Sequence, residues 1–178
     1  MIKKYSVSVP LSGKVYSLAK RCQNMMYESM FIKSSWIYGA EPHINLISGT
    51  TKNIDDIISC IKKFRLKENK NCELIGLGVL MTPDPLVFMR FTNSLLLKEL
   101  RYFLFRETLP LWDSLTPTVI DNIWIPKSTL AFKDFALDNL CNALISVKDI
   151  KFQLIMEISE LSIIEFTDKE YELKRISI

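Results

Sequence analysis

The sequence predicts an α+β protein of two similar lobes, each a small, mostly antiparallel sheet backed by helices, with a cleft between them. Its 178 residues, 48% of them hydrophobic, suit one domain (residues 1–178) with a sizeable core. Short alternating strand patterns are interspersed with amphipathic helix patterns. A five-residue pattern starting with proline occurs twice, 84 residues apart (126 − 42), within repeat units at about 36–92 and 120–167. Such a duplication predicts two similar lobes.

The composition excludes several classes of protein. Only 5 glycines and 7 prolines are present, which argues against a disordered or collagen-like chain. No apolar run reaches the roughly 18 residues that a membrane helix needs, and no apolar segment follows Lys3 and Lys4 as in a signal peptide. We therefore expect a cytoplasmic protein with no membrane contact, and the four widely spaced cysteines to be reduced and mostly buried. The net charge of +3 is compatible with an anionic ligand.

A single histidine, His43, limits the chemistry that this chain can perform. Reactions that need two imidazoles are excluded, and a zinc site is disfavoured because no second histidine is available. We expect no bound metal and no cofactor.

The first half of the chain alternates strand and helix patterns. Tyr5, Val7 and Val9 alternate with serines, which predicts a strand with one buried face. A one-sided helix follows, opened by Ser12 and Gly13. Further on, the sequence predicts an extended segment over 36–49, a helix over 54–64 capped by Asn53, and two strands over 73–81 and 86–91 joined by a turn.

The second half repeats this order. We expect a helix over 94–107, an extended segment around 125–130, a helix capped by Asp134, and two neighbouring strands over 152–158 and 162–166. A last short strand is predicted over 171–176. The apolar stretch over 95–105 could form a dimer face, but a buried helix explains it more simply.

The repeated patterns are Pro42-His43-x-Asn45-Leu46 and Pro126-Lys127-x-Thr129-Leu130. Each is followed by a predicted helix and then by two predicted strands. Equivalent positions in two similar lobes would face each other across the lobe junction, where ligand clefts commonly form.

These two motifs resemble those of the 2H phosphoesterase superfamily, whose best-known members are the 2′-5′ RNA ligase and cyclic phosphodiesterase proteins. The family carries two His-x-Ser/Thr motifs, one in each lobe, in which one histidine acts as general base and the other as general acid. The hydroxyls hold the phosphate oxygens. The resemblance implies that His43 is the first histidine and Thr129 the second hydroxyl. Lys127 stands in place of the second histidine, and Asn45 in place of the first hydroxyl.

Lys127 and Asn45 should weaken proton transfer while preserving anion binding. A solvated lysine, with a pKa near 10.4, is less than roughly one part in a thousand deprotonated at pH 7, whereas imidazole can act as acid or base there. Loss of one good proton-transfer group costs about 10² to 10⁴ in rate. The lysine charge still binds phosphate, and the asparagine amide still donates a hydrogen bond.

Each candidate residue also has a purely structural interpretation. His43 alone would be read as an ordinary strand histidine, and Lys127 as a surface lysine; their matching places in the duplication favour a site. Thr129 could equally be a strand residue without ligand contact. Tyr38 and Trp124 could stack on bases or only pack. The lysines and arginine between 62 and 70 are interrupted by acidic residues and indicate a solvated surface rather than a polynucleotide site.

Three functions remain open at this point. The first is binding, with metal-independent cleavage, of a nucleotide, cyclic oligonucleotide or short RNA, in which His43 and Lys127 are catalytic and Asn45, Thr129, Tyr38 and Trp124 contact the substrate. The second is a nucleotide-binding module without turnover. A protein-interaction scaffold is the third, and it is disfavoured because lysine and asparagine are phosphate-compatible replacements. The sequence indicates no oligomeric state.

Overall fold

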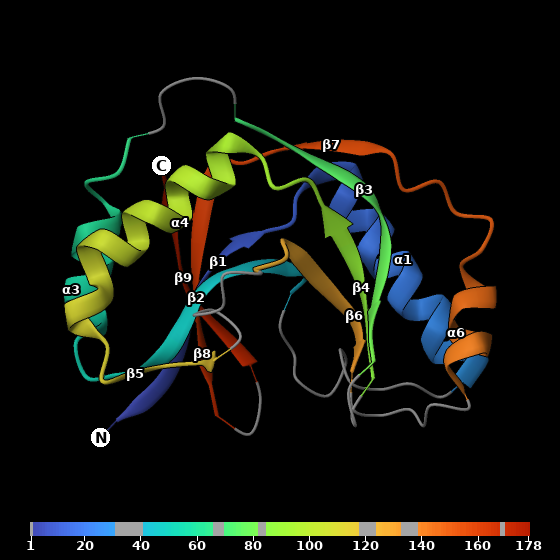
Figure 1. The fold of residues 1–178 in the computed structure, drawn as a ribbon, viewed down its shortest axis with the longest axis horizontal. Coiled ribbons are helices and arrows are strands. Elements are labelled where there is room, and N and C mark those ends of the chain that lie inside the picture. Colours follow the sequence, from blue (N-terminus) through green and yellow to red (C-terminus); the bar gives the residue numbers. More distant parts are fainter. Residues whose placement is uncertain are drawn as a thin grey trace.

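Two antiparallel sheets form the framework of the protein (Figure 1). The structure is a computed structural model and describes residues 2–30, 41–65, 70–81, 85–117, 124–132, 139–167 and 170–178. The first sheet has the strand order β5-β2-β1-β8-β9 and the second β6-β4-β3-β7. The strands of the first sheet are β1 (Lys3–Pro10), β2 (His43–Thr51), β5 (Ser114–Leu115), β8 (Glu160–Phe166) and β9 (Glu170–Ser177). Those of the second are β3 (Asn71–Leu80), β4 (Leu86–Phe91), β6 (Lys127–Phe132) and β7 (Leu154–Glu157).

Helices cover one face of each sheet (Figure 1). The helices are α1 (Gly13–Met30), α3 (Ile54–Ile61), α4 (Leu95–Thr108), the short 3₁₀ helix η1 (Leu109–Leu111) and α6 (Leu140–Ser146). Helix α4 packs on β2 and on α3, beside the first sheet, whereas α1 contacts β6, β7 and α6, beside the second. No helix in the described ranges is long and apolar enough to cross a membrane. The predicted fold class, two antiparallel sheets backed by helices, is confirmed.

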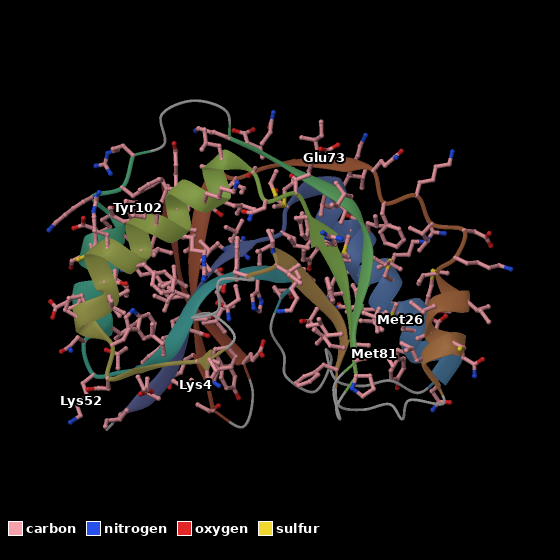
Figure 2. All side chains as sticks on the ribbon, in the orientation of Figure 1. Lys4, Met26, Lys52, Glu73, Met81 and Tyr102 are labelled. Atoms are coloured by element: carbon pink, nitrogen blue, oxygen red, sulfur yellow. The ribbon has the colours of Figure 1, made fainter. Side chains whose placement is uncertain are left out.

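The apolar pattern of the sequence explains the core. In β1, Tyr5, Val7 and Val9 are buried in the hydrophobic core, as their alternation predicts. The prediction of a single buried face is wrong, because Ser6 and Ser8 between them are buried as well. In α4, the side chain of Ser94 caps the helix by accepting a hydrogen bond from Leu97 N–H, at 3.3 Å. Four leucines of this helix are buried, at positions 96, 97, 100 and 104, so the apolar stretch is mainly a core element. Tyr102 stays 66% exposed on the same helix (Figure 2).

The structure corrects the predicted pairing of the last strands. We expected the strands around 152–158 and 162–166 to be neighbours, but β7 pairs with β3 in the second sheet and β8 pairs with β1 and β9 in the first. The chain therefore crosses between the sheets at Ile158 and Ser159. Similarly, β3 and β4 follow the first motif in sequence but belong to the sheet of the second motif. Each lobe thus combines strands from both halves of the chain.

Two local predictions also differ from the structure. Asn53 precedes α3, but its side chain forms no capping hydrogen bond; its amide nitrogen donates instead to the carbonyl of Leu111, at 3.4 Å. The cysteines are all free, as expected, but only Cys22 and Cys72 are buried, while Cys141 is exposed. Asp134, the predicted cap of the following helix, lies outside the described residues.

Candidate functional site

The two motifs start the two strands that meet between the sheets. Strand β2 begins at His43 and β6 at Lys127, and the two strands contact each other near the centre of the molecule before running apart into their own sheets (Figure 1). We call this place the junction. The proline before each motif is anchored in the same way, because its carbonyl accepts a backbone hydrogen bond from the chain next to it. Pro42 accepts from Leu11 N–H at 2.9 Å, and Pro126 from Phe91 N–H at 3.0 Å.

Both motif strands contain a β-bulge at the same place. On β1, Ser8 pairs with Asn45 and Val7 with Ile47, so Leu46 is an extra residue. On β4, Phe88 pairs with Thr129 and Val87 with Ala131, so Leu130 is the extra residue. Bulges bend a strand and redirect its side chains, and they are frequent next to functional sites. The repeated sequence pattern therefore corresponds to a repeated backbone shape.

Strand alternation places four predicted site residues on the open faces of the motif strands. His43, Asn45 and Lys127 are half-buried and Thr129 is exposed, whereas Ile44 and the other intervening residues are buried. Their strands β2 and β6 contact each other, and the charge of Lys127 adds a small lowering of the pKa of His43 to the larger effect of burial. The structure thus brings the two motif strands into contact, and a shared site formed by their residues remains a prediction.

The ring of His43 is held by a hydrogen bond to its own strand. Nδ1 lies 2.9 Å from the carbonyl oxygen of Glu41, and because a carbonyl can only accept, Nδ1 carries the hydrogen. A neutral ring then has an unprotonated Nε2. Burial lowers the pKa of His43, a shift that the Glu41 carbonyl and the charge of Glu172 on β9 partly oppose. At neutral pH, His43 is therefore suited to accept a proton at Nε2.

This lowered pKa makes the stability of the protein depend on pH through His43. In the unfolded chain the imidazole takes up a proton near pH 6.5, while the folded ring stays neutral. The unfolded state then binds more protons, so the free energy of unfolding should fall as the pH drops below about 7, by up to about 1.4 kcal/mol per pH unit.

The measurement is denaturant unfolding of wild type and H43Q between pH 5 and 8. Burial raises the pKa of Glu170 to about 7, so this carboxyl titrates in the same range with the opposite effect. The informative quantity is therefore the difference in the free energy of unfolding between the two proteins. As the pH falls, the wild type should lose stability relative to H43Q. A difference that does not change with pH would contradict the buried, neutral imidazole.

Lys127 and Asn45 are both incompletely satisfied within the described parts of the chain. Burial lowers the pKa of Lys127, and its amine takes part in none of the ion pairs found there. The side-chain oxygen of Asn45 is buried and accepts no hydrogen bond in those parts. An unmet buried acceptor costs about 1–3 kcal/mol, so an arrangement of this kind favours a ligand that supplies the missing partners.

Trp124 links the second motif to the first. Its Nε1–H donates to the carbonyl of Asn45 at 3.1 Å, and the guanidinium of Arg101 lies 4.9 Å from the centre of its ring. Arg101 in turn donates to the carbonyl of Leu46, at 2.9 Å. These contacts hold the bulge of β2 in place. Tyr38, the other predicted aromatic contact, lies outside the described residues.

The sequence did not identify two further groups near the site. The Tyr16 hydroxyl of α1 donates to the Glu41 carboxylate at 2.7 Å, beside the carbonyl that orients His43. Arg90 of β4 is the register partner of Lys127. Arg90 is exposed, whereas the adjacent residues Met89 and Phe91 are buried on the opposite face. That Arg90 lies beside Lys127 follows only from the pairing of β4 with β6.

Comparison with known proteins shows what this fold is similar to. No protein-family model and no curated protein matches the sequence. Among solved structures, TT0787 of Thermus thermophilus has a TM-score of 0.71 at 14% identity, covering 98% of this chain and 97% of that one. E. coli LigT in complex with 3′-AMP has a TM-score of 0.64 at 12% identity, covering 100% and 99%. A further structure, a phosphoesterase, has a TM-score of 0.60 at 12% identity, covering 100% and 99%.

These similarities extend over the whole chain, so this chain shares the fold of TT0787 and E. coli LigT. Within this shared fold, His43 and Lys127 stand at the starts of the two motif strands.

Proposed function

We propose that this protein binds a nucleotide or an RNA phosphodiester at the junction, with a phosphate group between His43 and Lys127. The observation that carries the proposal is the convergence of the two motifs on neighbouring strands from different sheets. An ammonium group, an amide and a hydroxyl are the groups that proteins use to bind phosphate oxygens.

Each motif residue has a distinct role in this proposal. Lys127 supplies the positive charge, and it makes no ion pair in the described parts of the chain that would neutralise it. Asn45 and Thr129 supply hydrogen bonds to the phosphate or to an adjacent ribose hydroxyl. The ligand class is supported by the similar structures of E. coli LigT, which contain ATP, 3′-AMP and NADP+.

The test is calorimetric titration with 3′-AMP, 2′,3′-cyclic AMP, a 2′-5′-linked diadenylate and a cyclic diadenylate. We expect at least one of these to bind, and K127A to weaken that binding at least about tenfold. The slope of the logarithm of the binding constant against the logarithm of the salt concentration should become smaller by about one in K127A, because one phosphate contact is lost. The matched control is K98A, which removes an exposed lysine from α4. Equal affinities in wild type and K127A, or no binding of any ligand by the wild type, would overturn the proposal.

A second candidate function is cleavage of the bound phosphodiester. It is favoured by the hydrogen bond from His43 to the Glu41 carbonyl, which leaves Nε2 free to take a proton from an attacking water or hydroxyl. Lys127 would then hold the phosphate or donate a proton to the leaving oxygen. Burial lowers the pKa of this amine, and a lower pKa makes it a better proton donor than a solvated lysine.

A further inference from the structure

Arg90 places a second positive charge directly beside Lys127. The two residues are register partners on the antiparallel strands β4 and β6, and such partners point to the same face of a sheet. Arg90 is exposed, and its neighbours Met89 and Phe91 are buried on the opposite face. Arg90 therefore lies on the face that carries Lys127 and Thr129.

No acidic side chain neutralises this pair in the described parts of the chain. Like charges placed opposite each other destabilise a sheet, and neither Arg90 nor Lys127 takes part in the ion pairs found there. Glu73, three residues before Gly76 on β3, is the acidic residue of the adjacent strand; it is exposed near one end of β3 (Figure 2) and joins none of those ion pairs.

The surface next to Arg90 is open. Its partner on the other side is Gly76 of β3, where an added Cβ would meet no atom within 4 Å. Gly76 also has a φ of +155°, a backbone conformation that side-chain-bearing residues rarely adopt. A ligand group can therefore approach the guanidinium of Arg90 above this glycine.

The order of the strands separates Arg90 from the phosphate proposed above. β6 is the edge strand of the second sheet and contacts β2, whereas β4 pairs with β6 on its inner side, so Arg90 stands one strand further from β2 than Lys127 does. Paired strands such as β4 and β6 are about 4.8 Å apart. A phosphate between His43 and Lys127 thus leaves the Arg90 guanidinium, which suits bidentate binding of phosphate, for a second anionic group.

We propose that Arg90 forms a second phosphate subsite next to Lys127, so that the preferred ligands are nucleotides carrying two phosphate groups. This inference rests on the proposed nucleotide binding at the junction. It names the substrate class more narrowly: a nucleoside bisphosphate, or an oligonucleotide whose adjacent phosphate occupies the same subsite.

The experiment compares the affinities of adenosine 3′,5′-bisphosphate and adenosine 3′-monophosphate at fixed ionic strength. Wild type should bind the bisphosphate at least about tenfold more tightly, as expected for one charge-assisted, bidentate contact. R90Q should reduce this ratio to about threefold or less while binding the monophosphate nearly as well as the wild type does. R90K, which keeps the charge but not the bidentate geometry, should retain an intermediate ratio.

The matched control is R21Q, which removes the same charge from an exposed position of α1. It should keep the wild-type ratio, so a change seen only in R90Q is local and not an effect of net charge. A wild type that binds both ligands equally, or an R90Q protein that keeps the full preference, overturns the second subsite while leaving the proposed function intact. Failure of the wild type to bind either nucleotide overturns the second subsite, and it overturns the proposed function as well if the cyclic and 2′-5′-linked ligands above also fail to bind. Thermal unfolding of R90Q and R90K confirms that the compared proteins are folded.

Discussion

Replacing Lys127 with histidine is expected to raise the hydrolysis of 2′,3′-cyclic AMP by about 10² to 10⁴ over the wild type. Position 127 begins β6, which contacts the strand β2 that begins at His43, and the hydrogen bond of Nδ1 to Glu41 leaves Nε2 of His43 unprotonated in the neutral ring. The K127H variant would carry a second imidazole that titrates near neutral pH, in place of an amine that is a weaker acid. His43 would take the proton of the attacking water, and the new imidazole would donate one to the ribose oxygen released from phosphorus.

The double variant H43A/K127H provides the control for this prediction. It keeps the new imidazole but removes the base, so its rate should fall back to that of the wild type or below. The rates are measured by chromatographic separation of cyclic and ring-opened products. Unchanged hydrolysis in K127H, with binding of the substrate retained, would contradict the view that the weak acidity of Lys127 limits hydrolysis at this site.

The second large effect is expected from replacing Lys127 with methionine. K127M should abolish phosphate-dependent nucleotide binding and raise the free energy of unfolding at pH 7 by about 1 kcal/mol. The structural reason is that Lys127 is half-buried, makes no ion pair in the described ranges and faces Arg90 across the strand pair. Methionine retains most of the packing and removes the charge.

The pH dependence of this stabilisation provides an internal check. Burial lowers the pKa of Lys127, so the unfolded chain binds a proton that the folded state holds less strongly. The gain in K127M should therefore be largest at neutral pH and disappear above about pH 10.5, where lysine is neutral in both states. K98M, at an exposed position, should change stability by less than about 0.5 kcal/mol and leave binding unchanged. Equal stability of wild type and K127M at pH 7 would contradict a destabilised lysine.

The sequence predicted those features that depend on residue type and local periodicity. The alternating strand and helix patterns and the duplicated motifs indicated an α+β fold with two antiparallel sheets, and the alternation of Tyr5, Val7 and Val9 identified a core strand. Leu46 and Leu130 were correctly marked as parts of one repeated pattern, although their bulges appear only in the strand register.

Features that depend on long-range pairing could not be predicted in this way. The apolar pattern of Leu161–Ile164 identifies a buried strand but not its partners. In the structure this strand, β8, pairs with β1 and β9 in the first sheet. Asn53 has a typical capping sequence, yet its side chain bonds to the distant Leu111. Arg90 is recognisable as exposed, but its relation to Lys127 exists only after β4 and β6 have paired.

The single histidine of the chain allows the most direct test of a phosphate site at the junction. In an untagged protein, the imidazole proton resonances belong to His43 alone, so nuclear magnetic resonance can follow this ring during titration with 3′-AMP without an assignment. We expect these resonances to shift saturably, with the dissociation constant found by calorimetry, and the pKa of His43 to rise when the dianionic phosphate is bound. Resonances and a pKa that stay unchanged at saturating nucleotide would contradict a phosphate site between His43 and Lys127.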